Sequence, residues 1–190
     1  MLNREKTIHS INNIIEHFEI KFQELPYVNK INLRIDPNNN NYMSSCGKIL
    51  KAILPTKPNT YVKNEKLKII WLGPDEWIVI NDQENELFIK LKNELGDLEA
   101  SVTDVSENRT IIRLSGKKIM TLLSKFLVLD LEKNLGTQSS CAQTLFVKVP
   151  ILLVRNDDNN QVPVIDIFTN RSHVNYIYNL IVDGTKNLDF

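Results

Sequence analysis

Cysteine is scarce in this sequence: its two residues, Cys46 and Cys141, lie far apart and outside any CxxC pair. A disulfide framework or a thiolate zinc site needs several cysteines at short, fixed spacings. The sequence therefore supports neither, and it is consistent with a reducing cytoplasm. We expect Cys141 to be a small buried hydrophobe.

Glycine is equally scarce, and neither GxGxxG nor GxxxxGK can be drawn through the six residues at positions 47, 73, 96, 116, 136 and 184. The HExxH and GxSxG motifs are also missing, as is any cluster of histidine, cysteine and carboxylate residues. We therefore predict no catalytic, cofactor-binding or metal-binding residues in this chain.

Long apolar runs are absent too, since none approaches the roughly 20 residues of a membrane-spanning helix. Arg4, Glu5 and Lys6 precede only scattered apolar residues, which is not a signal-peptide core. The 23 basic and 23 acidic residues cancel, which argues against the broad basic surface that nucleic-acid binding needs. We expect a soluble, cytoplasmic protein that binds neither membranes nor nucleic acids.

The chain, at 190 residues, is long enough for one domain, or for one domain of two closely packed halves. Near its start, apolar residues recur at steps of three and four, which predicts an amphipathic helix with one apolar stripe: Ile8, Ile11, Ile15, Phe18 and Phe22. The stripe packs either on the chain's own sheet or on a partner. We divide the chain into this N-terminal helix, residues 1–30, and a single α+β domain, residues 31–190.

Strand signals dominate the rest of the chain. Alternation predicts a strand over Ile31 to Ile35. Apolar runs at Leu67 to Trp71 and Trp77 to Ile80 flank a GPDE turn and predict a hairpin. A second hairpin is predicted over Ser101 to Leu114, around the polar group Ser106-Glu107-Asn108.

Helices are predicted between these strands. Each has a capping residue and apolar residues at helical spacing. Their caps and ends are Asn81 or Asp82 with Gly96, Ser115 with Leu127, and Asn170 or Ser172 with Gly184. Cys141 to Val154 reads as two strands or one kinked strand, and Val164 to Phe168 as a strand beside it. The order predicts an α+β fold of antiparallel sheets covered by helices, with repeated ferredoxin-like units.

Only a few residues are candidates for a site. Asp104 and Asp130 lie at the ends of predicted elements, where a carboxylate could serve an aminomethyl transfer; capping and turn hydrogen bonds are the favoured use. Trp71 and Trp77 flank the GPDE turn and could form an aromatic ligand site or belong to the core.

Arg109 and Arg113 share one face of a predicted strand, with Ile111 between them. Such a pair of cations is solvated, binds an anion or belongs to an interface. Arg109, Arg113 and Trp77 are the interface candidates.

The sequence also resembles a known family. LGPDEWIVI (72–80), VTDVSENRTIIRLSG (102–116), SSCAQT (139–144) and LPTKPNT (54–60) are similar to the gamma subunit of the heterotetrameric sarcosine oxidases, in the family's order. The resemblance covers roughly Ile31 to Ile181. The chain departs from the family at Glu107 and Asn108, where a basic pair is usual, and in the loop from Asn38 to Asn41.

The resemblance implies a fold related to the folate-binding aminomethyltransferase, or T-protein, domain. It implies partner subunits alpha, beta and delta, with FAD and FMN mainly on beta, NAD and tetrahydrofolate on alpha, and zinc on delta. The complex would oxidise sarcosine with oxygen to glycine and hydrogen peroxide, and yield 5,10-methylenetetrahydrofolate. This chain would be a structural subunit without a cofactor. The alternative is a free-standing folate-binding transferase or folate-sensing module.

Overall fold

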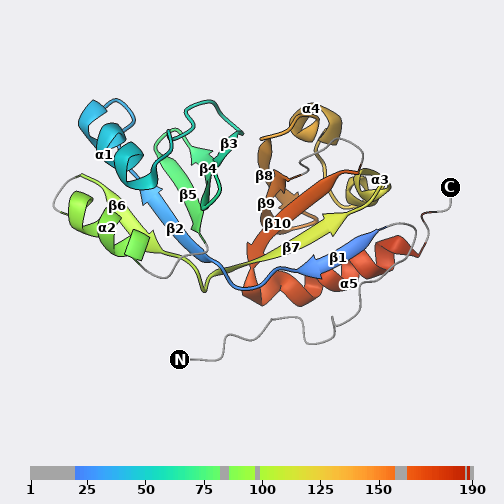
Figure 1. Ribbon diagram of the computed structural model, residues 1–190. Coiled ribbons are helices and arrows are strands. Elements are labelled where there is room, and N and C mark those ends of the chain that lie inside the picture. Colours follow the sequence, from blue (N-terminus) through green and yellow to red (C-terminus); the bar gives the residue numbers. More distant parts are fainter. Residues whose placement is uncertain (1–19, 82–85, 97–98, 157–161, 187, 189–190) are drawn as a thin grey trace. The chain divides into compact units, whose positions relative to one another are not determined.

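The computed structural model describes residues 20–81, 86–96, 99–156, 162–186 and 188 (Figure 1). The chain forms two compact units, each with its own hydrophobic core. Unit 2 is the continuous segment from Val28 to Ser106, and unit 1 combines the residues before it with those after it. Each unit is an antiparallel five-stranded sheet with helices against it.

Unit 2 is a ferredoxin-like unit with one additional strand. Its elements are β2 (Asn29–Arg34), α1 (Asn40–Leu50), β3 (Tyr61–Lys63), β4 (Leu67–Gly73), β5 (Glu76–Asn81), α2 (Glu86–Leu95) and β6 (Ser101–Asp104). The strand order is β3-β4-β5-β2-β6. Without the edge strand β3, the chain runs βαββαβ, and its four strands lie in the order 2-3-1-4. This is the split βαβ arrangement of ferredoxin-like folds.

The core of unit 2 lies between its sheet and its two helices. The alternation expected over Ile31 to Ile35 is confirmed, because Ile31, Leu33 and Ile35 are all buried. They form one cluster with Leu50 of α1 and Leu91 of α2. The hairpin predicted around the GPDE turn is also confirmed, as β4 pairs with β5.

Unit 1 repeats this arrangement. Its elements are β1 (Lys21–Glu24), β7 (Arg109–Ser115), α3 (Ile119–Ser124), α4 (Leu131–Leu135), β8 (Cys141–Phe146), β9 (Val149–Arg155), β10 (Val164–Asn170), a 3-10 turn (Arg171–His173) and α5 (Val174–Thr185). Read in the opposite direction, its strand order, β8-β9-β10-β7-β1, matches that of unit 2 position by position. Two differences are that two short helices follow β7 and that the edge strand beside β7 comes from the start of the chain. The predicted α+β fold with repeated ferredoxin-like units is therefore confirmed.

The helix expected over Ile8 to Phe22 falls mostly outside the described residues, and its last residues form a strand. Phe22 lies in β1, opposite Leu114 of β7, and is buried. Phe22 and Glu24 point inward while Lys21 and Gln23 are exposed, so the burial period here is two residues. The open edge of β7 gives this segment a strand partner, and the helical prediction was wrong here.

The second predicted hairpin is also wrong. β6 pairs with β2 in one sheet, whereas β7 pairs with β1 and β10 in the other. The polar residues that resemble a turn, Ser106 to Asn108, are the passage from unit 2 to unit 1. A polar interruption between two strands does not distinguish a turn from such a passage.

Several predicted helix ends also lie elsewhere. Asn81 is the last residue of β5, and Asp82 lies outside the described residues. Ser115 belongs to β7, so it does not cap α3. Gly184 lies inside α5, where a Cβ atom would come within 2.6 Å of the Phe126 ring; it permits close packing on α3 and its following turn.

Candidate functional site

The two tryptophans belong to the core of unit 2. Trp71 of β4 lies directly opposite Trp77 of β5, and both pack in the same cluster. Trp77 is completely buried, and its indole N–H donates to the carbonyl of Pro55 at 2.7 Å. The polar group of the side chain is thus satisfied internally.

Arg113 binds a carboxylate within unit 1. Its Nε and Nη2 atoms donate to the two carboxylate oxygens of Asp166 at 2.7 and 2.9 Å. The two residues are direct neighbours on β7 and β10. The Asp166 side chain is only 3% exposed, whereas that of Arg113 is 34% exposed. Two parallel bonds to a buried carboxylate are the strong form of ion pair.

The face that carries Arg113 is mostly covered. Ile111 is buried beside it, as are Phe168 on the neighbouring strand β10 and Leu152 on β9, the strand after that. Arg109 is half-buried and has interactions of its own. A partner contact of Arg109 stays a prediction.

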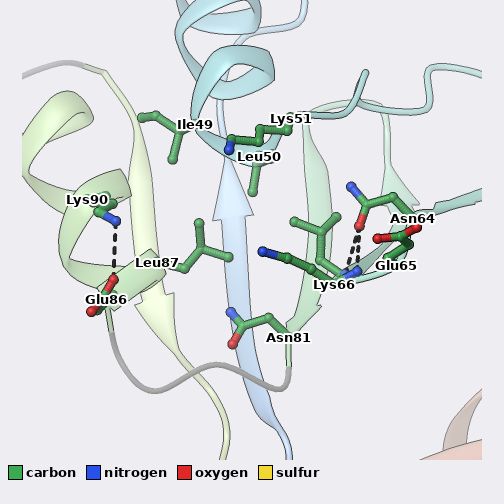
Figure 2. Close-up of a pocket in the computed structure, with 11 residues that line it drawn as sticks. Ile49, Leu50, Lys51, Asn64, Glu65, Lys66, Asn81, Glu86, Leu87 and Lys90 are labelled. Atoms are coloured by element: carbon green, nitrogen blue, oxygen red, sulfur yellow. Dashed lines mark hydrogen bonds and ion pairs between the residues drawn. The ribbon is translucent and has the colours of Figure 1, made fainter.

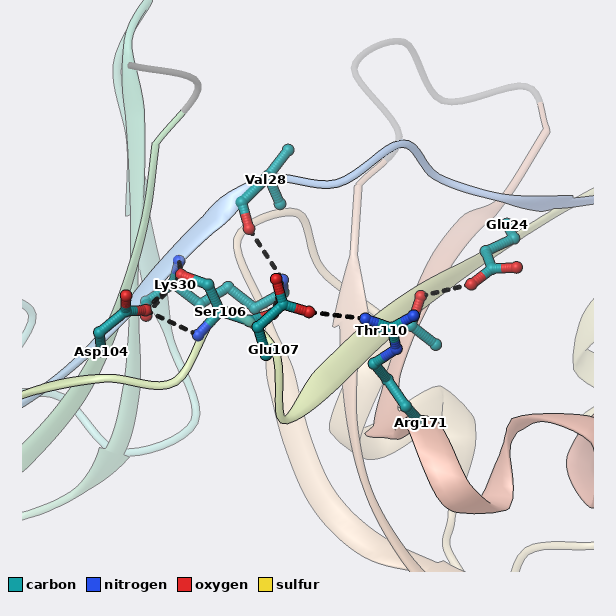
Figure 3. A network of polar contacts seen from close by, with 8 residues as sticks. All are labelled: Glu24, Val28, Lys30, Asp104, Ser106, Glu107, Thr110 and Arg171. Carbon is teal, nitrogen blue, oxygen red and sulfur yellow. Dashed lines mark hydrogen bonds and ion pairs between the residues drawn. The ribbon is translucent and has the colours of Figure 1, made fainter. Parts of the chain in front are cut away.

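Asp104 has a structural role in unit 2. Its carboxylate accepts from the backbone N–H of Ser106 at 2.9 Å and from the Ser106 hydroxyl (Figure 3). The same hydroxyl oxygen accepts from the backbone N–H of Lys30. Asp104 thus makes the turn hydrogen bonds favoured by the sequence.

Lys30 forms hydrogen bonds to both ends of unit 2. The side chain is buried, and its ammonium donates to the carbonyls of Val28 at 2.9 Å and Ser106 at 3.0 Å (Figure 3). Val28 and Ser106 are the first and last residues of the unit. The sequence analysis missed this residue, because a lysine within an alternating strand resembles an ordinary exposed position.

Unit 1 has one hydrogen bond and one ion pair near the points where its two segments meet unit 2 along the chain. Thr110 donates to the buried Glu24 at 2.7 Å, and Arg171 donates to Glu107 at 2.7 Å (Figure 3). Both partners of the second pair are solvent-exposed, so this pair contributes little to stability. The acidic residue at position 107, unusual by the resemblance, thus has an arginine partner in this chain.

Asp130 and the cysteines have bonding and burial typical of structural residues. Asp130 is the N-cap of α4 and accepts from the backbone N–H of Lys133 at 3.0 Å. Both cysteines are buried. Burial raises the pKa of Cys141 to about 12, while burial and the negative charge of Glu94 raise that of Cys46 to about 11. Neither thiol is a nucleophile at neutral pH.

A cavity of about 390 Å³ opens in unit 2 between α1, the β3–β4 turn and the start of α2 (Figure 2). Lys51, Lys66 and Leu87 are among the residues that line it. Its polar side chains make local bonds: Asn64 accepts from two backbone N–H groups of its own turn, and Glu86 pairs with Lys90. The lining thus carries charges of both signs.

Four exposed apolar residues at the β8–β9 hairpin of unit 1 and in the segment after α3 were not identified from the sequence. We call Val128, Leu145, Val147 and Pro150 the turn patch. Val128 is fully exposed, Leu145 is 52% exposed and Val147 is 44% exposed. Val147 also has a φ of 56°, a left-handed conformation that is unusual for a β-branched residue.

The described residues bring together no group of three or more histidine, cysteine or carboxylate side chains that could hold a metal ion. Within the same residues, no helix combines the length and the apolar character needed to cross a bilayer.

Comparison with known proteins gives consistent matches. The sequence model of the sarcosine oxidase gamma subunit family matches residues 34–187. Sarcosine oxidase subunit gamma of Corynebacterium sp. (strain P-1) is 25% identical over 142 residues, which are 74% of this chain and 70% of that protein. The subunit gamma of Arthrobacter sp. is 28% identical over 120 residues, or 63% of this chain and 59% of that protein.

Two solved structures share the fold. A chain of the heterotetrameric sarcosine oxidase from Corynebacterium sp. U-96, in complex with pyrrole 2-carboxylate, gives a TM-score of 0.81 at 20% identity, covering 90% of this chain and 86% of that chain. The glycine cleavage system aminomethyltransferase T from Bartonella henselae gives 0.62 at 12% identity, covering 87% of this chain and 46% of that one. Because the family model matches most of this chain, residues 34–187, the chain belongs to the sarcosine oxidase gamma subunit family.

Proposed function

We propose that this chain is the gamma subunit of a heterotetrameric sarcosine oxidase and that it acts in assembly. The observation that carries this proposal is the match to the gamma-subunit family over residues 34–187. The likeness in fold to a chain of a heterotetrameric sarcosine oxidase supports it. The partners are the alpha, beta and delta subunits, in the cytoplasm.

The chemistry of the complex belongs, in this proposal, to those partners. They hold FAD, FMN, NAD, zinc and tetrahydrofolate, oxidise sarcosine to glycine with oxygen, and produce hydrogen peroxide and 5,10-methylenetetrahydrofolate. In this chain, three of the titratable residues singled out from the sequence bind groups within the chain itself. Asp104 stabilises a turn, Asp130 caps a helix and Arg113 binds Asp166.

The test is to express a tagged copy in the native source and purify it under mild conditions. The proposal predicts that alpha, beta and delta co-purify in equal amounts and that sarcosine oxidase activity is recovered with them. It also predicts that the chain expressed alone is colourless and inactive. Flavin absorbance or oxidase activity in the chain alone would contradict the assembly role.

A second candidate function is folate binding, favoured by the fold shared with the aminomethyltransferase. This chain spans less than half of that enzyme's length. Titration of the purified chain with tetrahydrofolate separates the two candidates. Tight binding with turnover would support a transferase, tight binding without turnover a sensing module, and no binding the assembly role alone.

A further inference from the structure

We propose that the turn patch of unit 1 docks on an unlike subunit of the oxidase complex, against an apolar surface bordered by a carboxylate. This inference rests on the proposed function, because it needs a complex of unlike chains.

Backbone pairing brings the segments that carry the turn patch together. Leu127 forms an antiparallel bridge with Phe146, and the N–H of Val147 donates to the carbonyl of Phe126 at 2.9 Å. Val128 directly follows one residue of this bridge, and Leu145 directly precedes the other. Leu145 in turn lies opposite Pro150 on β9, which is also exposed. Leu127 and Phe146 belong to the core, whereas their chain neighbours Val128, Leu145 and Val147 are exposed.

The turn patch is also held firmly in place. Beneath it, the rings of Phe126 and Phe146 stack with their centroids 4.9 Å apart. The hydrogen bond between Val147 and Phe126 fixes the turn to the segment that follows α3. Rigid apolar groups lose little conformational freedom on association, which favours their use in an interface.

Val147 provides a second and independent observation. A β-branched residue in the left-handed region is strained, and glycine is the usual choice at such a position in a two-residue hairpin turn. Strain of this kind is commonly kept at sites with a function. An exposed valine here provides apolar surface at the tip of the turn, which glycine would not provide.

The positive charge of Lys148 favours an unlike partner over a second copy of this chain. Lys148, at the tip of the same turn, is exposed, and among the described residues no carboxylate pairs with it. A two-fold contact between identical turn patches would bring two Lys148 side chains together, and like charges at an interface are unfavourable. An unlike subunit can present a carboxylate to Lys148. A stable interface has roughly 20 residues on each side, so other residues must surround the four side chains of the turn patch. In this proposal the turn patch forms the centre of that interface.

The experiment uses the alpha, beta and delta subunits expressed together without gamma, immobilised, and titrated with the purified chain. Leu145→Asp and Val128→Asp each place a charge in the turn patch, and we expect each to weaken binding at least tenfold. Val128 is fully exposed, so its replacement leaves folding unaffected even if Leu145→Asp does not. The matched control is Ile53→Asp in unit 2, whose side chain is 82% exposed. It should bind as the wild type does.

Lys148→Glu gives a second readout. It should slow association and reduce the dependence of the association rate on salt, since it removes the attraction to the partner's carboxylate. Wild-type affinity in both Asp variants would overturn the docking site while leaving the proposed function intact. Failure of the wild-type chain to bind would instead refute the proposed function, and the docking site with it. A wild-type dimer that Leu145→Asp dissociates would show that a second copy occupies the turn patch, against this proposal.

Discussion

Arg113→Met tests the internal ion pair of unit 1. The substitution keeps much of the side-chain volume but removes both bonds to Asp166, which is 3% exposed. Removing one partner of a buried pair costs about 3–5 kcal/mol, because it leaves a charge in a poorly solvated place. A third of the Arg113 side chain reaches water, so we take the lower half of this range, about 3–4 kcal/mol. For a chain of this size, the melting temperature should fall by about 6–16 °C.

The assay is denaturation of the isolated chain followed by circular dichroism. Arg34→Met is the matched control, because Arg34 pairs with Asp75 at 2.8 Å on the open surface of unit 2. Its melting temperature should stay close to that of the wild type. Adding Asp166→Asn to Arg113→Met should restore much of the lost stability, since no buried charge then remains. An unchanged melting temperature for Arg113→Met alone would refute the internal role of the pair.

Three further predictions follow from single contacts. Lys30→Met should destabilise unit 2 by about 2–4 kcal/mol, because the carbonyls of Val28 and Ser106 lose a charged donor. Both tryptophans lie in unit 2, so tryptophan fluorescence follows its unfolding directly, and a wild-type midpoint would contradict the role of Lys30. Val147→Gly should not reduce the stability of the free chain, because relief of about 1–2 kcal/mol of backbone strain offsets the roughly 0.5–1 kcal/mol entropy cost of glycine. A clear drop in the melting temperature would show that Val147 is unstrained. The buried thiols should not react with a disulfide reagent at pH 8 in the folded chain, and rapid labelling under native conditions would contradict their burial. Their contribution to the free energy of unfolding should be full below about pH 9 and should decline as the pH rises toward about 11 for Cys46 and about 12 for Cys141.

The sequence predicted the fold class because its strongest patterns are local. Ile31, Leu33 and Ile35 alternate within one strand, and the GPDE turn joins two adjacent strands that pair with each other. The repeated ferredoxin-like arrangement follows from the order of such elements. The division between the units does not, because Ser106 to Asn108 has the composition of a turn and its neighbours are two strands in either case.

Two of the parts that the sequence did not predict depend on partners distant along the chain. Phe22 has the spacing of a helix residue and becomes a strand residue only because β7 has an open edge. Arg113 looks like an exposed strand residue until Asp166, 53 residues later, is placed opposite it. Helix α1 was also missed, although Asn39 accepts from the N–H groups of Asn41 and Tyr42 as its N-cap. In a run of four asparagines, the composition indicates a loop and hides the cap.

The turn patch could not be predicted for a related reason. Val128 and Leu145 sit in apolar stretches that read as core, and only the bridge between Leu127 and Phe146 shows which residues point outward. A positive φ at Val147 has no sequence signal, since valine is a poor residue for that conformation. Exposure of apolar residues is thus a property that the tertiary structure alone reveals.

The assembly role is tested most directly by native mass spectrometry of the oxidase purified through a tag on the alpha subunit, from cells with and without this chain. The account predicts one copy of this chain with one each of alpha, beta and delta, and a less stable or incomplete complex when the chain is absent. A fully assembled, active oxidase that never contains this chain would contradict it.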